Sequence, residues 1–393
     1  MSGKRLIYFD NAATTRVSGE VMEEMLPYLS SVYCNPSAVY SFASSGKVAV
    51  DNARKDTADL IGAKQSEIYF TSGGTESNNW ALKAAAESFE EKGKHIITTV
   101  TEHHSVLNTC GYLESRGGSV TYLEVEEDGK VSLEKLQNAI RKDTILISVM
   151  AANNEIGTVE PVAQIGKIAR ENNILSHTDA VQAYGHIPLN VDEMNIDMLS
   201  ASAHKINGPK GVGILYIRSG VRLRSFMHGG FQERGRRAGT LNVPGIAGMG
   251  KAARLAAENM SARSRKEMQL RDYFIGRVLD EIPCTALNGH RTDRLPNNAN
   301  ISFGFTEGET VLILLDQAGI CASAGSACAS GAVEASHVLT AIGLSRETAR
   351  SSLRFTFSYE NTTEEIDFAV SELKRIVAKL RENSAEYRRF AGN

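Results

Sequence analysis

The sequence has no excess of basic charge and no long apolar run. Its 43 Lys and Arg residues against 46 Asp and Glu residues give a net charge of -3 at pH 7, so it carries no basic footprint for nucleic acid. No apolar run approaches the roughly 18 residues that a membrane helix needs. The N-terminal stretch MSGKRLIYFDNAATT lacks the apolar core of a secretory signal. We therefore expect a soluble cytoplasmic protein that binds neither nucleic acid nor a membrane.

Cysteine is also scarce, and its spacing excludes two classes of site. The five cysteines contain no CxxC pair, which argues against a zinc ribbon or a thioredoxin-like site. Because five is an odd number, the cysteines cannot all pair with one another, and reduced intracellular thiols fit better than a disulfide framework. The cysteines stand at positions 34, 110, 284, 321 and 328.

Short β-branched runs alternate with amphipathic helical stretches through the first two thirds of the chain. Seven candidate strands occupy residues 67–71, 95–100, 119–125, 144–150, 174–178, 196–200 and 213–217. Between several of them lie helical patterns such as 132–142, where Ser132 suits the N-cap. This alternation predicts an α/β domain with a largely parallel sheet.

The pattern changes past about residue 258. A long charged helix over roughly 258–282 leads to strands near 298–303 and 351–357. The last long helix opens with Thr362-x-x-Glu365, a capping-box pattern. Since 393 residues exceed what one compact core usually holds, we expect two domains: a large one over 15–258, and a smaller α+β one formed by 1–14 and 259–393.

One glycine-rich turn could hold an anion. The stretch FTSGGTESNNWALKAA (70–85) passes from a strand through two glycines into a helix. Backbone N–H groups at such a helix N-terminus attract anions, so Gly74 and Thr75 are placed to hold a phosphate. The stretch has neither the GK[ST] of a Walker loop nor a GxGxxG pattern, and an ordinary strand-to-helix turn explains it equally well.

Polar side chains follow two other predicted strands. Ligands of open α/β sheets bind beyond the carboxyl ends of the strands, and Asp179 stands at such an end. His103 and His104 follow another strand, where either could stack on a flat ring or serve as a structural histidine. His177 and Asp179 could begin a metal site, but no third ligand has suitable spacing, and we expect no metal.

The stretch SASAHKINGPKGVG (200–213) adds Ser202, His204 and Lys205 at a further strand end. Lysine forms Schiff bases with carbonyl groups. Pyridoxal phosphate needs a lysine for its aldehyde, an acid for its ring nitrogen and a cradle for its phosphate. Lys205, Asp179 and the glycine-rich turn together supply this set, so the sequence predicts a pyridoxal phosphate site.

The ordered motifs resemble those of the NifS/IscS-type cysteine desulfurases, which are fold type I pyridoxal phosphate enzymes of the class-V aminotransferase family. The resemblance covers nearly the whole chain and implies a mostly parallel seven-stranded sheet in the large domain. A departure stands at Ala335, where the family often has proline. The motifs are YFDNAATT (8–15), SGGTESNN (72–79), TEH (101–103), NNEIGT (153–158), DAVQ (179–182), SAHKINGPKGVG (202–213), GGFQERGRRAGTLN (229–242), SAGSACASG (323–331) and SSLRF (351–355).

The resemblance implies a role for each cofactor-binding residue. Lys205 would bind the aldehyde, Asp179 would pair with the ring nitrogen, and His103 rather than His104 would stack on the ring. The remaining implied contacts are Thr75, Ser202 and His204 at the phosphate, Asn154 and Gln182 at the phenolic oxygen and substrate carboxylate, and Thr240 at the phosphate of the other subunit. The last contact implies a homodimer with shared sites.

The resemblance also implies the substrate and the reaction. Arg354 would clamp the carboxylate of L-cysteine, a task that suits a guanidinium group. The Cys328 thiolate would attack the sulfur of the substrate–cofactor adduct, which leaves L-alanine and a persulfide on Cys328. An iron–sulfur scaffold protein is the leading candidate for the sulfur acceptor. Lys205, Cys328 and His103 are thus the predicted catalytic residues.

Other functions remain open at this point. A selenocysteine lyase, another C–S lyase or a transaminase would use the same cofactor residues, although the GSAC run (325–328) favours sulfur transfer to a protein thiol. A non-catalytic adaptor would be favoured by the loss of Lys205, Asp179 or Cys328, and all three are present.

Overall fold

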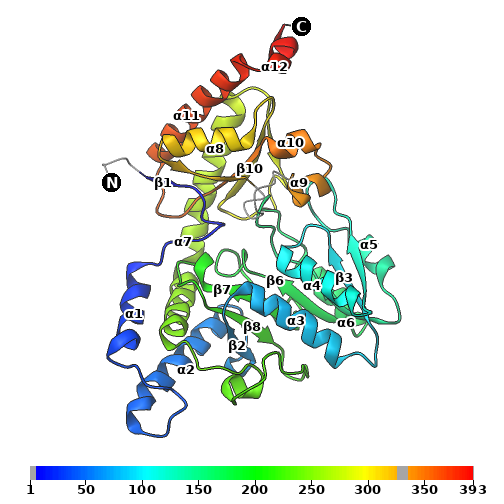
Figure 1. Cartoon of the computed structure of the whole chain (residues 1–393), viewed down its shortest axis with the longest axis vertical. Helices are drawn as coiled ribbons and strands as arrows, with labels where there is room; N and C mark the ends of the chain where they lie inside the picture. The colour runs from blue at the N-terminus through cyan, green and yellow to red at the C-terminus, as the bar shows by residue number, and fades with distance from the viewer. Residues whose placement is uncertain (1–5, 325–334, 393) are drawn as a thin grey trace.

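A seven-stranded sheet forms the centre of the larger part of the molecule (Figure 1). The structure is a computed structural model and describes residues 6–324 and 335–392. β8 runs antiparallel to both of its neighbours, and the other pairs are parallel. The predicted α/β fold with a mostly parallel sheet is confirmed. The strands lie in the order β2 (Ile68–Thr71), β8 (Gly213–Ile217), β7 (Met198–Ser202), β6 (Leu175–Asp179), β5 (Thr144–Ser148), β3 (His95–Thr99) and β4 (Ser119–Leu123).

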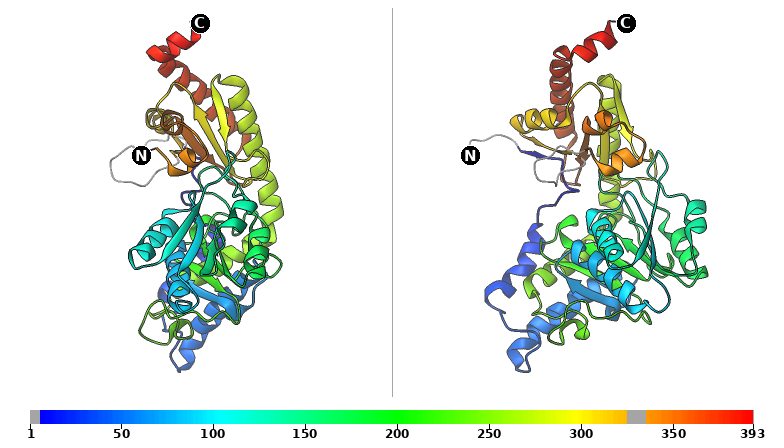
Figure 2. Two further views of the ribbon diagram at one scale, coloured as in Figure 1. Left: turned by 90° about the vertical axis from the view of Figure 1, so that its right-hand side faces the viewer. Right: turned by 45° about the vertical axis from the view of Figure 1, so that its right-hand side comes forward.

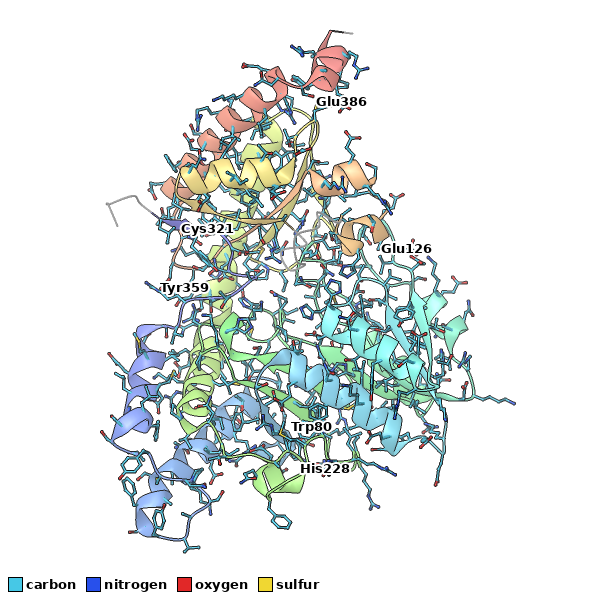
Figure 3. The ribbon with its side chains drawn as sticks, viewed as in Figure 1. Trp80, Glu126, His228, Cys321, Tyr359 and Glu386 are labelled. Atoms are coloured by element: carbon cyan, nitrogen blue, oxygen red, sulfur yellow. The ribbon has the colours of Figure 1, made fainter. Side chains whose placement is uncertain are left out.

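Helices cover both faces of this sheet. α3 (Gly74–Ser88) and α4 (His104–Ser115) pack on one face, around the fully buried Trp80 that Figure 3 labels. Strands that are buried on both faces are rich in apolar and β-branched residues, and strands such as β5 and β8 were visible in the sequence for this reason. The helices on the other face are α2 (Ser44–Asp59), α5 (Leu133–Ala139), α6 (Val162–Glu171) and the first half of α7 (Val243–Glu281).

α7 differs from its prediction, because it begins at Val243 rather than near residue 258. Asn242 caps it by accepting a hydrogen bond from the backbone N–H of Gly245 at 3.2 Å. The first turns contain small residues that allow close packing: a Cβ on Gly250 would lie 2.4 Å from the Cα of Ala53 in α2. These turns therefore lack the charged periodicity from which the helix was predicted. The predicted domain boundary at residue 258 falls inside this unbroken helix.

The smaller part contains a second sheet, and its core is a separate cluster of buried side chains that includes Phe9, Phe274 and Phe355. α7 connects the two parts along one side (Figure 2). β1 (Ile7–Tyr8) pairs with β11 (Ile320–Cys321), so the N-terminal residues join the smaller part. These features support our proposal of two domains. The antiparallel sheet has the order β12 (Ser323–Ala324), β13 (Ser352–Thr356), β10 (Asn298–Phe303) and β9 (Thr285–Asn288).

Two predicted helix caps are confirmed. Ser132 caps α5, and Thr362 and Glu365 form the capping box of α11 (Thr363–Glu382). Among the described residues, no helix has the length and apolar character that crossing a bilayer requires. The remaining helices are α1 (Gly19–Ser30), α8 (Gly308–Gln317), α9 (His337–Ala341), α10 (Arg346–Arg350) and α12 (Ala385–Ala391), and the 3₁₀ turns are η1 (Ser41–Ala43), η2 (Gln65–Glu67), η3 (Ala203–Lys205) and η4 (Gln232–Gly235).

Candidate active site

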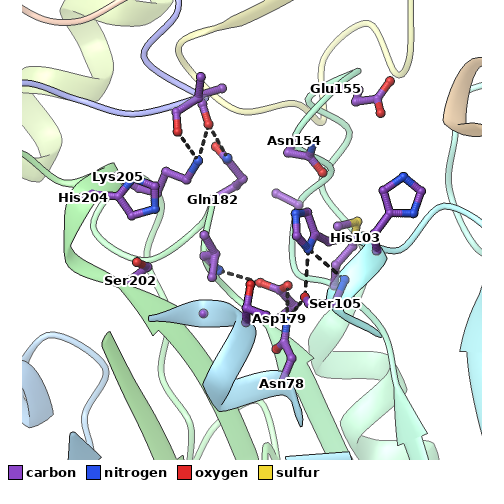
Figure 4. Close-up of a pocket in the computed structure, with 18 of the residues that line it drawn as sticks. Asn78, His103, Ser105, Asn154, Glu155, Asp179, Gln182, Ser202, His204 and Lys205 are labelled. Atoms are coloured by element: carbon purple, nitrogen blue, oxygen red, sulfur yellow. Dashed lines mark hydrogen bonds between the residues drawn. The ribbon is translucent and has the colours of Figure 1, made fainter. Parts of the chain in front are cut away.

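A cavity of about 380 Å³ lies where the carboxyl ends of β6 and β7 meet the start of α3 and the smaller part. Its volume is that of a pocket for a small ligand. Figure 4 shows Lys205, Asp179 and His103 facing the same space from η3, β6 and α4. Ten of the predicted site residues line this cavity: Gly74, Thr75, His103, Asn154, Asp179, Gln182, Ser202, His204, Lys205 and Arg354.

Lys205 ends η3, which directly follows β7. Its Nζ donates to the backbone carbonyl oxygen of Ala13 at 2.8 Å and also to that of Ala12. Gln182 donates to the same Ala12 oxygen from its Nε2, at 3.0 Å. Thr15 donates from its hydroxyl to the backbone oxygen of His204 at 3.0 Å. The N-terminal segment thus holds the amine of Lys205 at the wall of the cavity.

Asp179 is the last residue of β6 and is only 5% exposed. Its two carboxylate oxygens accept hydrogen bonds from Asn78 Nδ2 at 2.7 Å and from the backbone N–H of Val181 at 2.9 Å. A buried carboxylate is costly unless hydrogen bonds or a cation compensate it. These two donors fix the carboxylate so that it lines the cavity.

His103 caps α4 and is connected to Asp179 through hydrogen bonds. Its Nδ1 accepts from the backbone N–H of Ser105 at 3.1 Å and lies 2.8 Å from the Ser105 hydroxyl. Asn78 donates to the Ser105 hydroxyl at 2.8 Å and also to Asp179. Burial lowers the pKa of His103, so the ring is neutral at pH 7 and carries its proton on Nε2. The network fixes the orientation of the ring (Figure 4).

α3 begins at the cavity with Gly74 and Thr75, and the backbone N–H groups of a first helical turn, which have no partner within the helix, suit an anion. The turn lies so close to β8 that a Cβ added to Gly213 would be 2.7 Å from the Cα of Gly73. Thr75, Ser202 and His204 line the same cavity, and the Ser202 side chain is the one that a Cβ on Gly73 would meet at 3.8 Å. Burial and the nearby ammonium groups of two lysines lower the pKa of His204 to about 4. The His204 ring is therefore neutral at pH 7.

Arg354 enters the cavity from β13 of the smaller part and is only 4% exposed. Its Nη1 donates to the backbone oxygen of Asn154 at 2.9 Å, and its Nη2 donates to Asp10 at 2.9 Å. Its buried Nε has no hydrogen-bond partner among the residues that the structure describes. The guanidinium group is thus held in place by two of its five N–H donors, and the unused donors, Nε among them, suit a carboxylate.

Comparison with known proteins agrees with this geometry. The family model described as aminotransferase class-V matches residues 7–368. Cysteine desulfurase IscS of Methanosarcina thermophila is 53% identical over 380 residues, which cover 97% of this chain and 94% of the relative. Cysteine desulfurase IscS of Dictyoglomus turgidum is 52% identical, with 96% of each chain covered.

The chain belongs to the cysteine desulfurases of the class-V aminotransferase family. Two solved structures share the desulfurase fold. A NifS-like protein is 40% identical with a TM-score of 0.90, and the match covers 95% of this chain and all of the other. SspA in complex with cysteine is 40% identical with a TM-score of 0.80, and the match covers 91% of this chain and all of the other.

The donor set of this desulfurase fits pyridoxal phosphate. An amine, a buried carboxylate and the start of a helix converge on one cavity. Two buried polar atoms of the lining, Arg354 Nε and Asn78 Oδ1, have no hydrogen-bond partner in the described part of the chain. In that part, no group of three or more His, Cys, Asp or Glu residues could hold a metal ion.

The other two of the twelve predicted site residues of this desulfurase chain are Thr240 and Cys328. Thr240 is exposed and does not line the cavity, so its predicted role requires a second copy. Cys328 lies outside the described residues. Described residues on both sides of it contact the cavity lining: Ser323 pairs with Arg354 in the sheet, and Ser336 donates to Glu155.

Several residues of the desulfurase site were not predicted from the sequence. Asn78 lies four residues after Gly74 and therefore on the same side of α3, so helical spacing could have revealed it. Asp10, Glu155 and His337 come from loops and a short helix with no periodic signal. Glu155 lines the cavity and is buried, and burial raises its pKa to about 7 although Ser336 and Arg354 favour the charged form.

Proposed function

We propose that this chain is a pyridoxal phosphate-dependent cysteine desulfurase that converts L-cysteine to L-alanine. The sulfur becomes a persulfide on Cys328 and supplies iron–sulfur cluster assembly. The observation that carries this proposal is that Lys205, Asp179 and Arg354 line one cavity together with the start of α3, in a chain that matches cysteine desulfurases over nearly its whole length.

When bound, pyridoxal phosphate supplies an aldehyde and an electron-accepting ring. Lys205 would hold the aldehyde end of the cofactor, and Asp179 would hold its ring nitrogen. The neutral imidazole of His103 would stack on one face of the cofactor ring. The first turn of α3 would hold the phosphate together with Thr75, Ser202 and His204, which line the cavity.

Arg354 would bind the carboxylate of L-cysteine through its unpaired Nε, since Asp10 and the Asn154 backbone already fix its other nitrogens. Asn154 and Gln182 line the cavity beside it. Lys205 Nζ would take the proton from the α-carbon of the bound cysteine, because it is the basic group that Ala12 and Ala13 hold at the cavity wall.

Cys328 would accept the sulfur. Its thiolate would form an S–S bond with the substrate sulfur while the C–S bond of cysteine breaks, and the β-carbon would take up one proton to become the methyl group of alanine. The substrate sulfur is oxidised and the carbon is reduced, so no external oxidant is needed. The anchored positions of Ser323 and Ser336, on either side of the Cys328 segment, support this assignment.

We further propose a cytoplasmic homodimer in which Thr240 completes the phosphate site of the other subunit. Exposed apolar side chains concentrate in one region, which is unusual for a monomer. They lie on α1, α2 and the segment between them and include Leu26 at 55% exposure, Leu29 at 61% and Tyr33 at 75%. A second copy would cover them.

Mass spectrometry of the intact protein after addition of cysteine tests the function. We expect one extra sulfur atom on Cys328 and free alanine in the same solution. Cys328→Ser should abolish the added sulfur, whereas the matched variant Cys321→Ser should retain it. A keto acid as the product would indicate a transaminase, and no product at all would indicate an adaptor; either result would refute the proposal.

A further inference from the structure

A largely buried histidine contacts the backbone of Lys205 from outside the cavity. His186 Nε2 lies 3.0 Å from the carbonyl oxygen of Lys205 and is placed to donate to it. The Nδ1 of the same ring lies 3.9 Å from a carboxylate oxygen of Glu267 on α7. Glu267 is only 4% exposed. The imidazole thus stands between the residue predicted to carry the cofactor and the long helix that joins the two parts.

The chain around His186 is built to place this ring. Gly185 has a φ of +79°, a conformation that side chains disfavour, and a Cβ there would lie 2.8 Å from Ile206, one residue after Lys205. Ser264 of α7 donates from its hydroxyl to the carbonyl oxygen of His186 at 2.7 Å. Backbone and ring are therefore both fixed against α7.

The charges that face the ring favour its protonated form. Burial opposes a charge on His186, but the Glu267 carboxylate and the Lys205 carbonyl outweigh burial and raise the pKa. Arg263, on the preceding turn of α7, acts in the opposite direction. The Arg263 guanidinium lies 4.1 Å from the ring centre of Tyr359 (Figure 3). While Nε2 donates to the Lys205 carbonyl, only an imidazolium also carries the positive charge that pairs with the Glu267 carboxylate, 3.9 Å from Nδ1.

We propose that His186 is a positioning residue for Lys205, and that its imidazolium joins the Lys205 carbonyl to Glu267 and so fixes the backbone from which the reactive amine extends. This inference rests on the proposed role of Lys205. When His186 loses its positive charge, the link to the Glu267 carboxylate is lost. Turnover should therefore fall at alkaline pH, while cysteine binding through Arg354 stays unchanged.

Three variants of the holoenzyme test this role by the pH profile of alanine formation. His186→Phe removes both links and should lower kcat about tenfold without raising KM, the change that corresponds to one lost hydrogen bond. His186→Gln keeps a donor for the Lys205 carbonyl but carries no charge, so its kcat should recover only to the level that the parent shows at alkaline pH. Glu267→Gln removes the charge that retains the proton, so it should shift the alkaline fall of kcat to lower pH.

His95→Phe is the matched control. His95 is also buried, and its ring nitrogens contact Thr144 at 2.7 Å and Thr121 at 2.8 Å on the far strands of the sheet. The His95→Phe variant should have lower thermal stability but the kcat and the pH profile of the parent. The proposal is overturned if His186→Phe keeps the kcat of the parent, or if Glu267→Gln keeps its pH profile. The Glu267 variant decides the matter should His186→Phe fail to fold.

Failure of this inference is distinguishable from failure of the proposed function. The unmodified holoenzyme must first form alanine from cysteine. If it does not, the proposed function fails before any variant is measured. If it does, the variants test His186 alone.

Discussion

Replacement of Arg354 by alanine should raise the KM for cysteine far more than it lowers kcat. The buried Nε of Arg354 is the donor without a partner in the described residues, and the other two nitrogens are already bonded. A charge-assisted hydrogen bond to the substrate carboxylate contributes about 1.5–3 kcal/mol. Its loss should therefore raise KM roughly 10- to 150-fold.

Alanine release measured over a range of cysteine concentrations gives KM and kcat separately. Arg354→Lys keeps the charge but not the planar set of donors, so its KM should lie between those of the parent and Arg354→Ala. Asp10→Asn keeps an oxygen acceptor for Nη2 and should change KM much less.

Arg381→Ala is the matched control for the Arg354 experiment. Arg381 is also buried and donates only to backbone oxygens of the smaller part, away from the cavity. Its replacement should reduce stability without raising KM. A folded Arg354→Ala protein with the KM of the parent, or with a loss confined to kcat, would refute the assignment of Arg354 to the substrate carboxylate.

Two further predictions concern buried acids. The pKa of Glu155 is raised to about 7, so the folded chain retains the proton of this carboxyl group to higher pH than the unfolded chain. The free energy of unfolding should therefore decrease from about pH 5 to pH 8. Glu155→Gln should flatten that decrease in denaturant titrations. Glu233→Gln breaks its buried ion pair with Arg54, whose nitrogen lies 2.6 Å away, and should cost about 3–5 kcal/mol in the same assay. Arg16→Ala breaks only the exposed pair with Glu360 and should cost less than about 1 kcal/mol; equal costs for the two pairs would contradict the argument from burial.

The fold could be predicted wherever burial leaves a simple pattern. The strands of the large sheet lie within about two residues of their predicted positions, because strands buried on both faces are continuous apolar runs. The first half of α7 escaped prediction because its glycines and alanines serve close packing against Ala53 and its neighbours. β9 also escaped, since its burial varies along its four residues.

The site could be predicted where its residues follow the ends of strands. Asp179, Ser202 and Lys205 stand there, and the topology of a parallel sheet brings such positions together. Asp10 and Glu155 could not be found in this way, because tertiary packing alone brings an N-terminal segment and an internal loop to Arg354. Only the family resemblance pointed to Thr240 as a residue of a shared site.

The central claim is that Lys205 holds an aldehyde cofactor in this cavity. Reduction of the purified holoenzyme with borohydride makes such a link permanent, and peptide mapping by mass spectrometry then locates it. We expect the cofactor on Lys205 and unmodified Lys210, five residues away in the same motif. A cofactor attached to any other lysine, or none attached at all, would contradict the account.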